Sequence, residues 1–168
     1  VAIVGTPGSG KSTLARELGR RTGLPVIHLD HHFFLPGWEP KPDDEWRTLA
    51  EELLAGDSWV MDGAFAMETA VERADTVLFL DFPRRRGYAG SLKRLTLAYL
   101  GRHAPDFAPG CEDRLDRDFL RLLRTIHRYP REQRPQIAAD LERHRAEGTR
   151  VLVARDRHEL RRLVEELP

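Results

Sequence analysis

The chain has 168 residues, 40% hydrophobic and 32% charged, which suits one compact domain over residues 1–168 with a buried core. Lys plus Arg and Asp plus Glu number 27 each, and this balance argues against nucleic acid as a partner, although it leaves that partner open. The single cysteine, Cys111, excludes an internal disulfide framework and a multi-cysteine metal site, so we expect a reduced, cytoplasmic compartment. No apolar run is long enough to span a bilayer, and we expect no membrane partner.

The chain opens on a short apolar run at residues 1–4, which predicts a buried strand. Because this strand would start at Val1, we expect a few native residues to precede it. Residues 5–13 then read Gly-Thr-Pro-Gly-Ser-Gly-Lys-Ser-Thr and fulfil the Walker A pattern G-x-x-x-x-G-K-[ST], with a helical pattern following. Such a P-loop points backbone N–H groups into one concavity, and the next helix adds its positive dipole end. The sequence therefore predicts a nucleoside triphosphate site.

The P-loop residues also have individual expected roles. Lys11 is long enough to reach the β- and γ-phosphates of ATP, and we count it as catalytic. The hydroxyl of Ser12 suits Mg²⁺, a hard cation that takes oxygen ligands and bridges to phosphates. The expected nucleotide-binding residues are Thr6, Pro7, Gly8, Ser9, Gly10, Lys11, Ser12 and Thr13.

Buried strands and helices alternate along the rest of the chain. Further strands are expected at residues 25–30, 58–63, 76–81 and 151–154. Helices are expected at about 11–22, from a cap at 43 to Gly56, at 66–74, 83–100 and 115–130, around 137–141 before Gly148, and around 160–167. A proline-rich, irregular loop is expected around Trp38, and a mobile segment at 101–114. The alternation predicts a parallel sheet with helices on both faces.

Three of the five expected strands end in an aspartate, at the sheet edge where ligands bind. Asp62 is expected to orient the waters of Mg²⁺, with a cap on the turn at Gly63 as the alternative. Asp30 is expected to accept a proton from an attacking hydroxyl or to bind Mg²⁺ through water, and the alternative is again a cap. For Asp81 the preferred role is to cap the helix entered through Pro83.

Two clusters near Asp30 have a functional and a structural interpretation. Three histidines suggest a metal site, but strand alternation and the lack of a helical pair favour a structural role for His28, His31 and His32. Four aromatic residues would either stack a base or enclose an acceptor, or else cover the core: Phe33, Phe34, Trp38 and Phe65.

A series of short segments resembles the small P-loop kinases, the group of adenylate, shikimate and gluconate kinases. More narrowly, the chain resembles the adenylate-kinase-like DNA topology modulation (FlaR-related) proteins. The segments are the P-loop, Leu29-Asp30, Leu35–Trp38, Trp59–Gly63, Leu80–Arg84, Gly110–Glu112, Tyr129-Pro130 and Arg134-Pro135. The resemblance implies a three-layer α/β/α fold, a five-stranded parallel sheet of order 2-3-1-4-5, and a helical lid segment at about 84–134.

The same resemblance assigns roles to residues outside the P-loop. An acid at the position of Asp30 serves the acceptor in shikimate and gluconate kinases. Arg94 aligns best with an arginine of the lid, with Arg128 and Arg131 as weaker candidates, whereas an arginine expected one turn earlier is replaced by Gly90. The two arginines that hold the acceptor phosphate in adenylate kinases are absent from residues 33–36 and 64–66, which puts AMP as the acceptor in doubt.

Two functions of different classes remain open. The first is a kinase that transfers the γ-phosphoryl group of Mg²⁺-ATP to a small hydroxyl or phosphate acceptor. The second is a nucleotide-dependent DNA-topology or regulatory protein, motivated by the arginines at 84–86 and 121–134. The balanced charge and the lack of a recognisable DNA-binding motif favour the kinase. The acceptor and the oligomeric state are left open.

Overall fold

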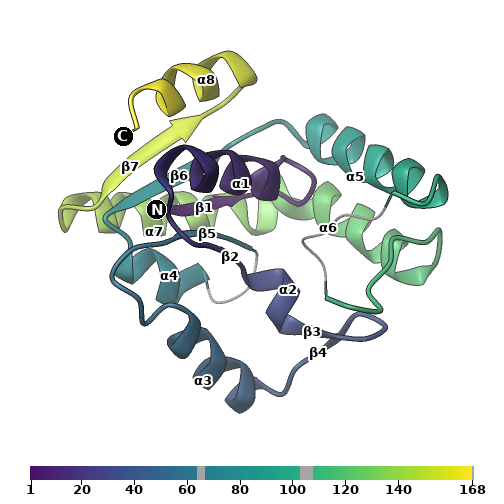
Figure 1. Ribbon diagram of the computed structural model, residues 1–168. Helices are drawn as coiled ribbons and strands as arrows, with labels where there is room; N and C mark the ends of the chain where they lie inside the picture. Colours follow the sequence, from purple (N-terminus) through teal and green to yellow (C-terminus); the bar gives the residue numbers. More distant parts are fainter. Residues whose placement is uncertain (64–66, 103–107, 168) are drawn as a thin grey trace.

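The computed structural model describes residues 1–63, 67–102 and 108–167. A parallel five-stranded sheet of order β2-β5-β1-β6-β7 lies at its centre (Figure 1). Counted along the chain, this is the order that the resemblance implies. The strands are β1 (Ala2–Gly5), β2 (Val26–His28), β5 (Val60–Asp62), β6 (Thr76–Leu80) and β7 (Arg150–Ala154).

The helices follow the predicted alternation. They are α1 (Lys11–Thr22), α2 (Leu29–Phe33), α3 (Asp43–Leu53), α4 (Met67–Arg73), α5 (Arg84–Tyr99), α6 (Arg117–Glu132), α7 (Arg134–Ala146) and α8 (Arg157–Glu165). Two predicted caps are confirmed: Gly23 ends α1 with φ 75°, and the carboxylate of Asp156 accepts from two N–H groups at the start of α8. In α3, by contrast, Pro42 is the cap and Asp43 is already helical.

Three local predictions differ from the structure. The second strand ends at His28, and Asp30 lies in the short helix α2. The proline-rich loop contains a small antiparallel hairpin, β3 (Phe34–Leu35) with β4 (Glu39–Pro40). Helix α6 runs through Pro130 to Glu132, so the predicted break at Pro130 is wrong, although the proline removes one helical N–H donor.

The two faces of the sheet have separate cores. Neighbouring residues of β1 point to opposite sides, so Ala2 and Val4 pack into one cluster and Ile3 into the other. Helices α1 and α8 cover the side of Ile3, while α3, α4 and α7 contribute to the opposite cluster (Figure 1). This three-layer arrangement fixes the carboxyl ends of β1, β2 and β5 beside one another. Within the described ranges, no helix combines the length and apolarity that a bilayer span requires.

The base of the α5–α6 segment is held by an ion pair rather than by the predicted cap. Asp81 lies before α5 and Arg134 opens α7, directly after α6. Arg134 donates Nε and Nη2 to the two carboxylate oxygens of Asp81 at 2.6 and 2.7 Å, so the predicted capping role of Asp81 is wrong. A bidentate arginine explains this, because it satisfies both carboxylate oxygens at once. The pair joins the two points where this helical segment leaves and re-enters the sheet.

Tyr129 lies near this ion pair, and its hydroxyl allows a prediction about stability. Its ring is buried, burial raises the pKa of its phenol, and among the described residues its hydroxyl has no hydrogen-bond partner. Because a buried unpaired hydroxyl is unfavourable, Tyr129→Phe should leave stability unchanged or raise it by about 1 kcal/mol. Thermal unfolding measures this, with Tyr88→Phe at an exposed hydroxyl as the control. A loss above about 1 kcal/mol would mean that the phenol has a partner that matters.

Candidate active site

The P-loop joins β1 to α1 and has the backbone that its glycines predict. Gly5, Gly8 and Gly10 have φ of 147°, 73° and 103°, values that other residues rarely adopt. Ser9 N–H donates to the Thr6 carbonyl at 3.2 Å and closes the turn. Gly10 immediately precedes α1, whose first N–H groups therefore face the loop. The loop thus has the concave form that binds phosphate.

Lys11 lies against the loop itself. Only 7% of it is exposed, and its Nζ donates to the carbonyl oxygens of Gly5 and Thr6 at 3.1 and 3.3 Å. Burial lowers the pKa of its ammonium group, and the charge of Arg94 lowers it further, whereas Asp30 and Asp62 oppose the shift. Asp30, Asp62 and Arg94 are therefore each close enough to Lys11 to interact with it electrostatically.

Ser12 and Asp62, the two residues predicted to serve Mg²⁺, contact each other directly. The Ser12 hydroxyl donates to Oδ2 of Asp62 at 2.7 Å, and Asp62 is only 3% exposed. Its other oxygen, Oδ1, accepts from Nδ1 of His28. Hydroxyl and carboxylate oxygens are ligands that suit Mg²⁺, so the donor set fits this ion.

Sequence reasoning missed the role of His28. It treated this residue as a structural member of a strand, but the imidazole fixes one oxygen of the predicted magnesium ligand Asp62. A signal was available, because His28 and Asp62 are register partners at the carboxyl ends of neighbouring parallel strands. The predicted strand order, combined with that register, would have paired them.

Asp30 reaches the same edge from the first turn of α2. A Cβ built on Gly63 would lie 3.2 Å from Oδ1 of Asp30 and 2.8 Å from Cβ of Leu29. The glycine that follows Asp62 therefore leaves room for Asp30 beside the end of β5. The two carboxylates predicted to act on the acceptor and on Mg²⁺ are brought to the same end of the sheet.

Helix α5 lies directly on the P-loop. A Cβ on Gly90 would overlap the carbonyl oxygen of Gly8, and one on Gly87 would lie 2.8 Å from that of Pro7. The resemblance led us to expect an arginine near position 90, but this contact leaves no space for a side chain. Arg94 follows one turn later, and its guanidinium pairs with Asp113.

The other two predicted lid arginines lie away from these contacts. Arg128 and Arg131 are exposed on α6, and Nε of Arg128 is 3.7 Å from a carboxylate oxygen of Glu132. Of the three candidates, Arg94 is the one whose charge is found to act on Lys11 in the described structure.

The family relationship agrees with this geometry. Residues 1–89, just over half of the 168-residue chain, match the model of a family described as an AAA domain. The chain belongs to this AAA domain family. The matched range holds the P-loop, Asp30 and Asp62, so nucleotide binding is implied for the AAA domain.

A relative of known class gives a narrower comparison. A shikimate kinase of Paracidovorax citrulli (strain AAC00-1) is 58% identical over 31 residues, which are 18% of this chain and 17% of that protein. The chain therefore spans only about a sixth of the length of this curated relative. The similarity is partial and suggests the group of small-molecule kinases.

Three hydroxyls around the P-loop of the AAA domain are buried without a partner among the described residues. They belong to Thr6, Ser9 and Ser91, the last on the face of α5 that meets the loop. Leaving such a group unpaired costs about 1–3 kcal/mol, so these donors favour a bound group that accepts hydrogen bonds. The phosphates of a nucleotide are such a group.

Gly90→Ala tests the contact between α5 and the P-loop. The added methyl group must displace either the helix or the Gly8 peptide, so ATP affinity should fall about 10-fold or more while the protein remains folded. Titration with a fluorescent ATP analogue measures the affinity. Gly56→Ala is the matched control, because nothing lies within 4 Å of a Cβ at that position. Equal affinity in both variants would show that the contact does not matter for the nucleotide.

The aromatic and histidine clusters differ from each other. Phe33 is buried and packs edge-on against Trp46 at 5.1 Å, so it covers the core, whereas Phe34 packs on Trp38 at the hairpin. Phe65 lies outside the described residues.

Burial and neighbouring positive charge lower the pKa of His32. In the described part of the chain, no group of three or more His, Cys, Asp or Glu side chains is arranged to hold a metal.

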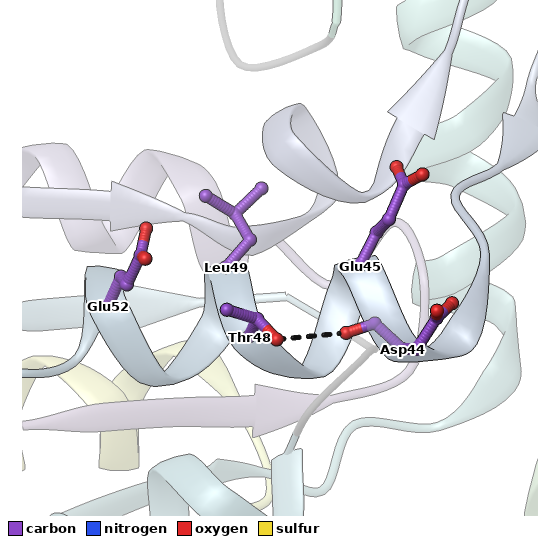
Figure 2. A pocket seen from close by; sticks show the side chains of 5 residues that line it. All are labelled: Asp44, Glu45, Thr48, Leu49 and Glu52. Carbon is purple, nitrogen blue, oxygen red and sulfur yellow. Dashed lines mark hydrogen bonds between the residues drawn. The ribbon is translucent and has the colours of Figure 1, made fainter.

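A hollow of about 420 Å³ lies on the outer face of α3, away from the P-loop. Its lining consists of Asp44, Glu45, Thr48, Leu49 and Glu52 (Figure 2). Three carboxylates would repel a triphosphate, so this hollow does not compete with the P-loop as the nucleotide site.

Proposed function

We propose that this AAA domain is a magnesium-dependent kinase that transfers the γ-phosphoryl group of ATP to a small hydroxyl or phosphate acceptor. One observation carries the proposal: the charges of Asp30, Asp62 and Arg94 all act on Lys11, the lysine of a complete P-loop. A site that only held a nucleotide would not need a carboxylate on the acceptor side. The partial similarity to a shikimate kinase supports the same class.

The donor half of the site would bind and neutralise the triphosphate. Loop N–H groups and the start of α1 would bind phosphate oxygens, and Lys11, now bound to the carbonyls of Gly5 and Thr6, would donate to the phosphates instead. Ser12 and Asp62 would hold Mg²⁺, with His28 fixing the carboxylate. When bound, this ion supplies charge neutralisation at the phosphates.

The acceptor half would be organised by Asp30. An acceptor hydroxyl beside this carboxylate would give up its proton as it attacks the γ-phosphorus. Arg94, whose charge acts on Lys11, would help Lys11 to neutralise the transferring group. We also propose that residues 84–134 act as a lid and that residues 1–168 form a single kinase domain. Membership of the narrower DNA topology modulation family likewise remains a proposal.

A panel experiment tests this function. ADP release from Mg²⁺-ATP is measured alone and with nucleosides, nucleoside monophosphates, shikimate and small polyols, with Lys11→Ala as the control. We expect release that one acceptor class stimulates and that the control lacks. Release that none of them stimulates would contradict this acceptor range and turn attention to the nucleotide-dependent DNA-binding alternative. That alternative predicts duplex DNA binding that weakens steeply with salt.

A further inference from the structure

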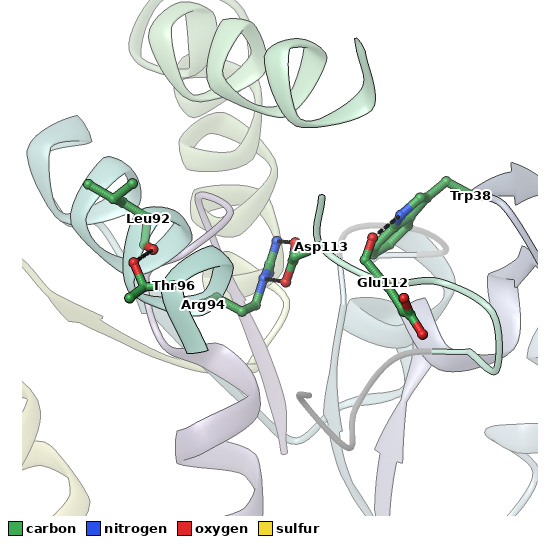
Figure 3. A network of polar contacts seen from close by, with 6 residues as sticks. All are labelled: Trp38, Leu92, Arg94, Thr96, Glu112 and Asp113. Carbon is green, nitrogen blue, oxygen red and sulfur yellow. Dashed lines mark hydrogen bonds and ion pairs between the residues drawn. The ribbon is translucent and has the colours of Figure 1, made fainter. Parts of the chain in front are cut away.

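A short strap, residues 110–113, lies on the hairpin that follows Asp30. The Gly37 N–H donates to the Gly110 carbonyl at 3.1 Å, and the Cys111 thiol donates to the Leu35 carbonyl at 3.2 Å. Nε1 of Trp38 donates to the carbonyl of Glu112, also at 3.2 Å (Figure 3). Three consecutive strap residues are thus bound to the hairpin. They belong to the segment 101–114 that we expect to be mobile, of which residues 103–107 lie outside the described residues.

The fourth strap residue, Asp113, holds Arg94. Nε and Nη2 of Arg94 donate to Oδ2 and Oδ1 of Asp113 at 2.5 and 2.8 Å, and the Asp113 side chain is only 6% exposed (Figure 3). A guanidinium has five N–H donors, and this pair uses two of them on one edge. The pair therefore fixes the plane of the guanidinium.

Arg94 is also fixed from its own helix. It follows Gly87, Gly90 and Ser91 along the face of α5 that rests on the P-loop. Its charge contributes to lowering the pKa of Lys11, which means that the two cations lie within interaction range. An arginine held at both ends of its side chain loses little freedom when a substrate binds, so less binding energy is spent on ordering it.

We propose that Asp113 is the positioning residue for Arg94, and that residues 110–113 tie this positioning to the hairpin on the acceptor side. The inference rests on the proposed function, in which Arg94 meets the transferred phosphoryl group. It goes beyond that function because it names the residue that aims Arg94 and the element that carries it. The strap then connects the hairpin to Arg94, so that a shift of the hairpin also moves Arg94.

A mutant cycle with water as the acceptor tests the pair. Single-turnover release of ADP from Mg²⁺-ATP is compared in wild type, Arg94→Ala, Asp113→Asn and the double variant, with ATP affinity and thermal stability measured in parallel. Asp113→Asn should lower the rate about 10–100-fold with ATP affinity within about 3-fold. The double variant should be no slower than Arg94→Ala, because Asp113 acts only through Arg94. Asp113→Glu, which keeps the charge, should recover part of the rate.

The outcomes separate this inference from the proposed function. A wild-type rate in Arg94→Ala would overturn the role of Arg94 in the proposed function. It would also overturn the inference, because Asp113 would then have no functional arginine to position. A slow Arg94→Ala beside a wild-type Asp113→Asn would overturn the inference alone. A faster Asp113→Asn would also overturn it, because Asp113 would then restrain Arg94 rather than aim it.

A backbone variant tests the strap without touching the ion pair. Gly110 has φ 79°, and a Cβ there would lie 2.9 Å from Cβ of Pro36 in the hairpin. Gly101 has a similar φ of 71°, and no atom of the described residues lies within 4 Å of a Cβ there, so it is the matched control for backbone strain. Gly110→Ala should slow ADP release about 10-fold relative to Gly101→Ala at similar stability. Equal rates in the two variants would overturn the link between the strap and the hairpin.

Discussion

Replacing Asp30 with Asn is expected to lower phosphoryl transfer about 10²–10⁴-fold while ATP affinity stays nearly unchanged. The amide keeps the size of the side chain, but it replaces one acceptor oxygen with an NH₂ donor and is a far weaker base. Asp30 lies in the first turn of α2, next to Gly63 and outside the P-loop, so the nucleotide contacts should persist. Steady-state kinetics with the acceptor identified in the panel, together with titration of an ATP analogue, measure both effects.

Asp44→Asn is the control, since Asp44 is an exposed carboxylate on α3. It removes the same charge from the chain at a distance from the P-loop. Turnover in Asp30→Asn that matches this control would exclude Asp30 as the base. A parallel loss of ATP affinity would instead mean that Asp30 acts through Mg²⁺ and the phosphates, which is the other role that the sequence predicts for it.

The fold was largely predictable because its signals are local. Strong apolar runs give the strands, and the Walker A pattern sets the connection between β1 and α1. Alternation of strand and helix then permits few topologies. The order of the strands came from the resemblance, because the hydrophobic pattern of a buried parallel strand does not say which neighbours it has. The AAA domain match spans only residues 1–89, so the sheet beyond β6 rests on the structure itself.

The site was predictable in part, for a related reason. Residues inside the P-loop motif have fixed relations to one another, so Lys11 and Ser12 could be assigned from spacing alone. The contacts of His28 with Asp62 and of Arg94 with Asp113 join residues 34 and 19 positions apart, and no motif links them. The wrong role for Asp81 has the same origin. A helix cap is a local contact that a sequence can suggest, whereas the actual partner of Asp81 is Arg134, which lies 53 residues away.

The second large effect is expected for Lys11→Met, which should lower kcat/KM at least about 10²–10³-fold by removing a charged donor from the phosphates. Its effect on stability should be small. The ammonium group is buried and is bound only by two loop carbonyls in the described structure, with burial lowering its pKa. An apolar side chain of similar length avoids that desolvation, so the free energy of unfolding without ATP should stay within about 1 kcal/mol of wild type or rise.

Lys11→Met is thus expected to lower kcat/KM strongly but to change stability without ATP little, which makes the prediction specific to nucleotide binding. A ligand present at 100 times its Kd stabilises the folded state by about 2.7 kcal/mol, so saturating ATP should raise the Tm of the wild-type protein by several degrees. Lys11→Met should lose most of that rise, while Lys93→Met, at an exposed position on α5, should keep it. If ATP protected Lys11→Met as well as it protects Lys93→Met, the triphosphate would not depend on Lys11. The loop would then bind nucleotide through its backbone N–H groups and Mg²⁺ alone.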